Sequence, residues 1–320
     1  MKKDIIVEID PLTRCNLRCH TCPQGRREMP NNSKPMCPIK LDTWLNIISK
    51  QRNIRTISIY WAGEPFLHPH LEEIVRVCNV HCKDVLVITN GNGRMTSLES
   101  YAKHEPKVTS VSLSGWTQEV YGRHHVGGLV NNAREFILKA HRLGMKSIQL
   151  NCHLYPDTLP ELPMWEKFAK SLGYPLITRF PAFLFMDDWK KNIKYDDYFM
   201  DVDEIIKFAP VNKECMTMDT MIAISPSGEY YHCENINDLS VPVLGSVETV
   251  SVDEHIAMRR SSSICKECMS KGYSYMSNGN QVLPDFVQIW RANKWNLKMY
   301  LDLPIRKLLY QYKVGYRKLL

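Results

Sequence analysis

The chain has 320 residues, of which 44% are hydrophobic and 23% are charged, a composition typical of a globular protein. No apolar run is long enough to cross a bilayer, and eleven cysteines without an export signal favour reduced thiols and metal ligands, hence a cytoplasmic protein. The net charge of +7 equals the excess in residues 289–320, which hold eight lysines and arginines against one aspartate. The rest of the chain is balanced, so nucleic acid is not an expected partner.

From residue 5 to about residue 183, apolar runs of strand length alternate with stretches of helical period. The expected strands span residues 5–10, 54–61, 84–89, 108–113, 146–154 and 175–180. The expected helices span residues 41–51, 70–80, 94–104, 129–143 and 161–172. Six such units predict an α/β fold, a partial (β/α)6 TIM-type barrel, in which the chemistry lies at the C-terminal ends of the strands.

Three cysteines follow the first predicted strand: Cys15, Cys19 and Cys22 stand in the segment C-N-L-R-C-H-T-C-P. Three thiolates can hold three irons of a [4Fe–4S] cube and leave the fourth iron open to a substrate. This spacing and the preceding strand resemble the radical S-adenosylmethionine (SAM) superfamily, in which SAM chelates the open iron. The alternative is a zinc site or a set of free thiols, although zinc usually takes four protein ligands.

The resemblance extends to the ends of the following strands. The segment Gly63, Glu64, Pro65 is similar to the family's GGEP loop, with alanine in place of the first glycine, and implies that its backbone and glutamate receive the amino group of SAM. Ser112, in S-L-S-G, resembles the segment that contacts the ribose and carboxylate of SAM. Asn90 and Asn151 complete the cofactor-binding residues that the resemblance implies.

A second set of cysteines lies near the C-terminal end of the predicted barrel. It consists of Cys215, Cys233, Cys265 and Cys268. With Gly228 placed five residues before Cys233, the set resembles the start of the SPASM pattern, which in full has seven cysteines and two auxiliary clusters. No cysteine follows Cys268, so the chain is similar to the shorter twitch form with one auxiliary [4Fe–4S] cluster. A structural zinc bound by four thiolates is the alternative.

These patterns predict three parts of the chain. A radical SAM partial barrel spans residues 1–205, and a small C-terminal auxiliary-cluster domain spans residues 206–282, with a β-hairpin over 222–233 and a short helix over 253–260. A basic aromatic helical tail spans residues 283–320. Its composition suits either a helix packed on the barrel or contact with the inner face of a membrane.

The resemblance implies two [4Fe–4S] clusters and SAM as cofactors, and a reductant such as flavodoxin or ferredoxin as a partner. It implies cleavage of SAM to a 5′-deoxyadenosyl radical, which removes a hydrogen atom from a small-molecule substrate. One auxiliary cluster is similar to the layout of the twitch aminocyclitol dehydrogenases, and predicts oxidation of an alcohol carbon on a sugar- or cyclitol-like substrate. Arg179 and His153 are the candidates for holding or deprotonating the substrate oxygen.

Three other hypotheses remain open. A radical epimerase would return a hydrogen atom from a thiol, and Cys37 is the spare cysteine nearest the predicted barrel mouth. Modification of a peptide side chain is more typical of complete SPASM proteins. A non-catalytic iron–sulfur protein, which transfers electrons or senses redox state, is disfavoured by the open triplet. The remaining cysteines, Cys78, Cys82 and Cys152, are expected to be buried apolar side chains.

Overall fold

The computed structural model describes residues 2–22, 24–26, 34–60, 63–153, 155, 157–179, 214–215, 217–233 and 243–271. The predicted basic tail, Ala62 of the glycine loop and the first residues of the predicted auxiliary domain lie outside the described residues. The boundaries of the three predicted parts therefore stay predictions.

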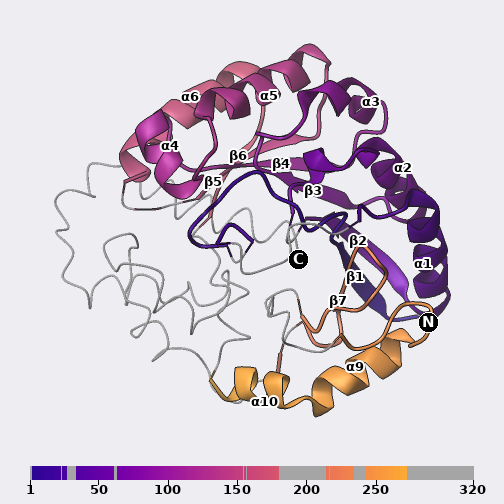
Figure 1. Cartoon of the computed structure of the whole chain (residues 1–320). Coiled ribbons are helices and arrows are strands. Elements are labelled where there is room, and N and C mark those ends of the chain that lie inside the picture. The colour runs from indigo at the N-terminus through magenta and orange to yellow at the C-terminus, as the bar shows by residue number, and fades with distance from the viewer. Residues whose placement is uncertain are drawn as a thin grey trace.

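Within the described residues, seven strands form one parallel sheet in the order β6-β5-β4-β3-β2-β1-β7. The strands are β1 (Asp4–Ile9), β2 (Asn53–Ile59), β3 (Val85–Thr89), β4 (Val108–Leu113), β5 (Ile148–His153), β6 (Leu176–Arg179) and β7 (Met221–Ile224). The first six follow one another in chain order across a curved sheet (Figure 1), which confirms the partial barrel.

The helices of the barrel lie along the outer side of this sheet (Figure 1). They are α1 (Pro38–Gln51), α2 (Leu71–His81), α3 (Leu98–Ala102), α4 (Gln118–His124), α5 (Val130–Arg142) and α6 (Leu162–Leu172), with short 3₁₀ turns η1 (Pro65–Leu67), η2 (Met95–Ser97) and η3 (Leu159–Glu161). Beyond the barrel, α9 (Val252–Ser261) and α10 (Ser263–Ser270) follow β7. Neither α4 nor α10 was predicted, because both are short and lack a clear apolar period.

Alternation along the strands separates an apolar outer face from a more polar inner face. On β1, Val7 and Ile9 are fully buried in the core under the helices, whereas Glu8, only 2% exposed, lies on the opposite face. On β5, Cys152 belongs to the same core and is 3% exposed, as predicted, and its neighbour Asn151 points the other way. The inner face of the barrel therefore offers polar groups, which a bound molecule needs for orientation.

The predicted hairpin over 222–233 is present, with a short antiparallel pairing across its turn. After the turn only one antiparallel bridge forms among the described residues of this segment, between Ile224 and Tyr230, supported by the hydrogen bond from Tyr231 N to Ala223 O at 3.0 Å. Strand β7 pairs in addition with β1, in parallel, with Ile6 opposite Met221, which the sequence did not predict. The auxiliary segment thus begins as an edge strand of the barrel sheet.

A glycine at the turn after β7 packs against helix α1. Gly228 has φ +85°, and a Cβ there would collide with the ring of Trp44. The Trp44 ring is buried, and its Nε1 donates to Glu248 Oε1 at 2.9 Å. Because both the backbone conformation and the space exclude a side chain, this position in the cysteine pattern requires glycine.

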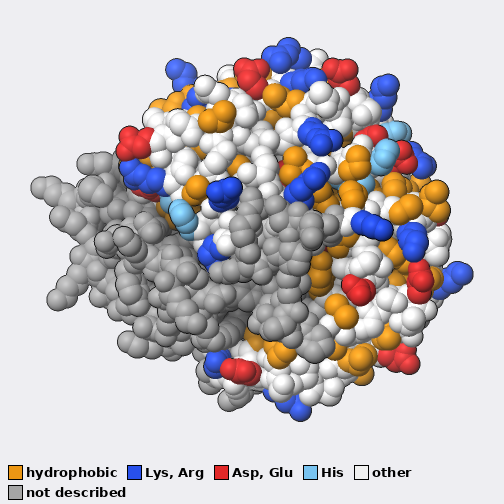
Figure 2. All heavy atoms as spheres, viewed as in Figure 1, with side chains coloured by type: hydrophobic (Ala, Val, Ile, Leu, Met, Phe, Trp, Pro, Cys, Tyr) orange, Lys and Arg blue, Asp and Glu red, His pale blue; other side chains and the backbone are white. Residues whose placement is uncertain are grey.

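The described surface carries mixed charges. Figure 2 shows lysine and arginine side chains interspersed with acidic ones over the visible face, without a concentrated basic patch among the described residues. Among the described helices none is both long and apolar enough to span a bilayer.

We expect Gly228→Ala to lower the free energy of unfolding by about 2 to 4 kcal/mol, because it combines positive-φ strain with overpacking against Trp44. Gly144→Ala is the matched control, since Gly144 has φ +76° but no atom within 4 Å of the place a Cβ would take, and should cost about 1 kcal/mol. Urea unfolding of the two variants measures the difference, and equal losses would contradict the proposed contact.

Candidate cofactor and metal sites

The three N-terminal cysteines lie together in the loop after β1. Cys22 N donates to Cys19 O at 3.2 Å, and Arg26 N donates to Cys22 O at 3.0 Å, so the segment is held in tight turns. Burial raises the pKa of the Cys19 thiol, and the neighbouring charges of Cys22 and Cys15 raise it further. Because the charges of Cys22 and Cys15 affect the pKa of Cys19, the three thiols lie near one another and could share one positively charged group. Such a group would lower the thiol pKa.

Close backbone packing fixes this loop. Arg18 N donates to Val126 O at 2.8 Å, which ties the middle of the triplet to the turn after α4. A Cβ on Gly25 would collide with the backbone of Cys19, so glycine alone fits there. Backbone contacts therefore fix much of the path of this loop.

The Glu64 carboxylate joins the ends of two strands next to the triplet. Glu64 is 2% exposed; its Oε1 accepts from Phe66 N at 3.0 Å and Thr89 Oγ1 at 2.6 Å, and its Oε2 accepts from Asn90 N at 2.7 Å. Burial raises the pKa of Glu64 from 4.5 to about 6, although these hydrogen bonds act in the opposite direction. Its predicted contact with the SAM amino group stays a prediction.

The residues flanking Glu64 bring backbone and amide groups to the cysteines. A Cβ on Gly63 would collide with Leu12 O, so the glycine loop lies directly on the chain leading to the triplet. Pro65 is buried at the start of η1. Asn90 Nδ2 lies 3.8 Å from Cys15 Sγ. Gly63, Glu64 and Asn90, three of the predicted cofactor-binding residues, are thus gathered beside the triplet.

Ser112 and Asn151 are register partners on β4 and β5. Asn151 is 5% exposed, and its Oδ1 has no hydrogen-bond partner among the described residues. A buried acceptor without a donor costs free energy, and a hydroxyl or amino group of a bound molecule would satisfy it. The pair therefore fits the predicted role in holding a polar cofactor.

A histidine pair flanks a serine at the ends of β4 and β5. Ser114 Oγ lies 3.1 Å from His125 Nε2 and 3.4 Å from His153 Nδ1. Burial, followed by the nearby His153 and His124, lowers the pKa of His125 to about 3, so this ring is neutral. Ser114 thereby links a buried neutral ring to His153 at the barrel mouth, a contact that sequence reasoning missed.

The other two predicted catalytic residues are less defined. Arg179 is the register partner of His153 at the end of β6, but its side chain lies outside the described part of the structure. Cys37 is exposed at the N-cap of α1, next to the buried Met36. The structure does not bring Cys37 into contact with any other predicted site residue that it describes.

Two buried acids on the inner face were not predicted. Tyr60 Oη donates to Glu8 Oε1 at 2.7 Å, and Tyr231 Oη donates to Asp10 Oδ2 at 3.2 Å. Glu8 and Asp10 are 2% and 1% exposed. The sequence contained a signal for them: Glu8 lies within an apolar strand, and Asp10 follows two residues later. Residues two positions apart on a strand point to the same face. The Asp10–Tyr231 hydrogen bond links the segment that precedes Cys15 with the segment that precedes Cys233.

The second cysteine set lies beside β7, near its first residues. Cys265 and Cys268 lie on α10, whereas Cys215 precedes β7 and Cys233 follows the turn. Burial raises the pKa of the Cys265 thiol; Arg259 acts against this, and Cys215 adds to it. Cys215 and Cys265 therefore lie near each other although fifty residues separate them in the chain.

A cluster and a mononuclear zinc ion need different thiol spacings. Tetrahedral zinc with Zn–S bonds near 2.3 Å needs sulfur atoms about 3.8 Å apart. Among the described residues, neither cysteine set has three thiols within 4.8 Å of one another. A [4Fe–4S] cube, whose thiolates bind separate irons, accepts the wider spacing.

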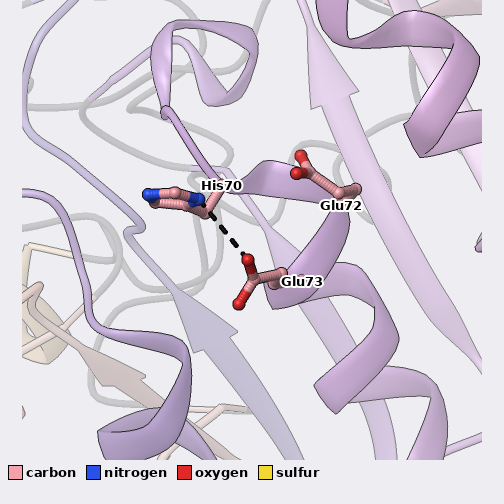
Figure 3. A group of neighbouring side chains, drawn as sticks. All are labelled: His70, Glu72 and Glu73. Atoms are coloured by element: carbon pink, nitrogen blue, oxygen red, sulfur yellow. Dashed lines mark ion pairs between the residues drawn. The ribbon is translucent and has the colours of Figure 1, made fainter.

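One group does meet that distance within the described chain: His70, Glu72 and Glu73 at the start of α2. His70 Nδ1 lies 3.5 Å from Glu73 Oε1 (Figure 3), and both side chains are about half exposed. Acids in the first turn of a helix stabilise its positive end, which accounts for this pair.

The fold and the site define a class of protein: a parallel α/β barrel with a cysteine triplet at the C-terminal end of its first strand, beside a buried carboxylate and an unpaired polar group. Residues 9–168, half of the chain, match the model of the Radical SAM superfamily, and the chain belongs to this superfamily. The family implies a [4Fe–4S] cluster and SAM. Cys15, Cys19 and Cys22 fit the cluster, and Asn151 fits a polar ligand such as SAM.

Curated relatives support the same family. A probable GTP 3′,8-cyclase of Methanococcus maripaludis strain C5 is 28% identical over 166 residues, which cover 50% of this chain and 53% of that protein. The probable cyclase of strain S2 matches equally. The chain thus spans about half the length of the curated relatives it matches.

Solved structures agree in fold. SuiB of Streptococcus suis, bound to S-adenosylmethionine, has a TM-score of 0.59 at 13% identity, over 84% of this chain and 72% of SuiB. The enzyme anSMEcpe, with bound AdoMet and the Cp18Cys peptide, has a TM-score of 0.53 at 14% identity, over 91% of this chain and 100% of that one.

The pH dependence of stability should report the buried Glu64. Because its folded pKa of about 6 exceeds the usual 4.5, its stabilising contribution is fully present below pH 4.5 and falls by about 2 kcal/mol as the pH rises through 6. Urea unfolding across this range should show the fall in wild type and its loss in Glu64→Gln. The half-exposed Glu73→Gln is the control and should keep the wild-type slope.

Proposed function

We propose that this radical SAM enzyme oxidises an alcohol carbon of a small polar substrate, of the sugar or cyclitol class, with a second cluster as electron acceptor. The observation that carries this proposal is the pairing of β1 with β7. Strand β1 leads into the first cysteine set, and β7 leads into the turn before Cys233. The two sets therefore start from neighbouring strands of one sheet, a layout that suits transfer of an electron between a shared substrate and both sites.

In this proposal the protein binds, orients and shields its reactants. When bound, the first cluster and SAM supply the 5′-deoxyadenosyl radical that removes a hydrogen atom, and a flavodoxin or ferredoxin is the expected source of the electron. Asn151 and Ser112 would hold the polar cofactor, and Glu64 keeps the surrounding loops in place. His153, oriented through Ser114, would hold the substrate oxygen or accept its proton.

Oxidation needs a proton acceptor as well as an electron acceptor. The buried Asp10 is a second candidate for this role, since it follows β1 on the inner face and its carboxylate already accepts from Tyr231 Oη. Arg179, at the register position beside His153, would serve as a clamp for substrate oxygen and not as a base.

Peptide modification is the second candidate function. It is favoured by the fold likeness to SuiB, solved with its precursor peptide SuiA at a TM-score of 0.60, and to anSMEcpe, solved with a peptide. Epimerisation has less support, because its hydrogen donor must lie beside the substrate radical and Cys37 is exposed. Substrate identity therefore needs a direct assay with polyols and with peptides.

Cleavage of SAM tests the first step. Reduced, anaerobically reconstituted protein should form 5′-deoxyadenosine, and Cys15→Ala, Cys19→Ala or Cys22→Ala should lower the rate by at least about a hundredfold, because each removes an iron ligand. Chromatography of the products measures this. Cys78→Ala, a buried core cysteine, is the control and should retain cleavage once folded. A triplet variant that cleaves SAM at the wild-type rate would contradict the assignment.

The role of the second set is tested separately. We expect Cys265→Ala with Cys268→Ala to retain SAM cleavage but to lose net oxidation of the substrate, because the substrate radical then has no electron acceptor. The measurement is the ratio of oxidised product to 5′-deoxyadenosine. An unchanged ratio in protein that holds only one cluster would refute the acceptor role.

A further inference from the structure

A buried cation lies beside the second cysteine set. Arg259, on α9, is 3% exposed, and its Nη1 donates to Met221 O at 2.8 Å and to Met218 O at 3.4 Å. Both carbonyls belong to the segment that leads into β7. These neutral acceptors orient the guanidinium but do not balance its charge.

The next residue on the same helix shows the contrast. Arg260 is about half exposed and pairs with Glu214, at 3.1 Å, and with Asp219. Arg259 has no carboxylate partner among the residues that the structure describes. Burying an unpaired charge costs free energy, so an acidic partner would be expected at the buried Arg259 more than at the exposed Arg260. The structure shows the opposite arrangement among its described residues.

The groups around Arg259 are thiols and histidines. His232 Nε2 lies 3.3 Å from Cys265 Sγ, and Cys265 is 6% exposed. Thr217, His232, Cys233 and Arg259 line one small hollow next to β7. His255, one turn before Arg259 on α9, is fully buried against the Tyr230 ring. The anion that could balance this arginine is therefore supplied by the cysteines.

We propose that Arg259 is the counter-cation of the thiolate-ligated auxiliary centre and that, together with an N–H from His232, it raises the reduction potential of that centre. This inference rests on the auxiliary cluster of the proposed function. Four thiolates give a [4Fe–4S] centre a net negative charge, and reduction adds one more. A fixed buried cation and an N–H···S hydrogen bond both stabilise the reduced form, so the centre accepts one electron more readily.

A raised reduction potential would favour electron transfer in one direction, from the substrate radical to the auxiliary centre. A substrate radical that has lost a hydrogen atom must give up one electron, and a proton from its oxygen, to become a carbonyl. An auxiliary cluster held by the second cysteine set would supply the acceptor for that electron, and Arg259 would make the transfer more favourable. If the four cysteines were neutral free thiols, Arg259 would have no negative charge beside it to stabilise.

The test uses the full chain with Cys15→Ala, Cys19→Ala and Cys22→Ala, so that the auxiliary centre alone contributes to the spectra. Iron, sulfide and zinc are first quantified after anaerobic reconstitution. The reduction potential is then measured by a dithionite titration followed by electron paramagnetic resonance. In this background Arg259→Gln removes the buried charge, and Arg260→Gln removes the neighbouring paired charge as the matched control.

We expect Arg259→Gln to shift the reduction equilibrium at least tenfold toward the oxidised form, which is about 59 mV for a one-electron couple. Arg260→Gln should leave the potential at the value of the background. His232→Phe should shift it in the same direction as Arg259→Gln but by less, because it removes an N–H and no full charge.

Each outcome decides a separate point. Zinc in place of iron would overturn the auxiliary cluster of the proposed function, whereas an iron–sulfur centre with an unchanged potential in Arg259→Gln would overturn only the role of Arg259. If Arg259→Gln fails to load iron, Arg259→Lys takes its place in the test, because lysine keeps the positive charge. Iron loading of Arg259→Lys with a reduction potential near that of the background supports the proposal. Failure of both variants, with Arg260→Gln intact, would assign Arg259 a purely structural role and overturn it.

Discussion

The arrangement of the first site depends on one buried carboxylate. Glu64 accepts hydrogen bonds from the start of η1 and from the end of β3, and its own N–H donates to Arg14 O at 2.9 Å, one residue before the triplet. Three segments that are distant in the chain thus meet at one residue. Removing a carboxylate that satisfies several buried donors would leave those donors unpaired, and the loops that surround the cysteines would lose their common anchor.

Strand β1 connects the two cysteine sets. It leads directly into the triplet, it pairs with β7 on its other edge, and Asp10 beyond its end accepts from Tyr231. The triplet follows the C-terminal end of β1, whereas Cys215 precedes β7 and Cys233 lies on the segment that runs back along β7 from its turn, so the two sets flank neighbouring strands of one sheet. The electron transfer that we propose would run between these two sets, which the pairing of β1 with β7 ties to one sheet.

A buried cation lies beside the second cysteine set. At the second set, an exposed arginine on α9 pairs with acids at the surface, whereas its buried neighbour Arg259 contacts carbonyl oxygens and thiols. At the first site the Glu64 carboxylate lies close to the cysteines, and Arg26, whose Nη1 donates to His20 O at 3.0 Å, lies in the same loop.

The sequence alone determined the order of the first six strands, the family and the cysteines proposed as ligands, because alternation, helical period and ligand spacing are local patterns. It also placed Cys152 in the core by simple alternation. Tertiary structure decided the pairing of β7 with β1, the Ser114 link between two histidines and the burial of Arg259 against carbonyl oxygens. Each of these joins residues far apart in the chain, and the free energy of such contacts depends on burial and geometry, which no local pattern encodes.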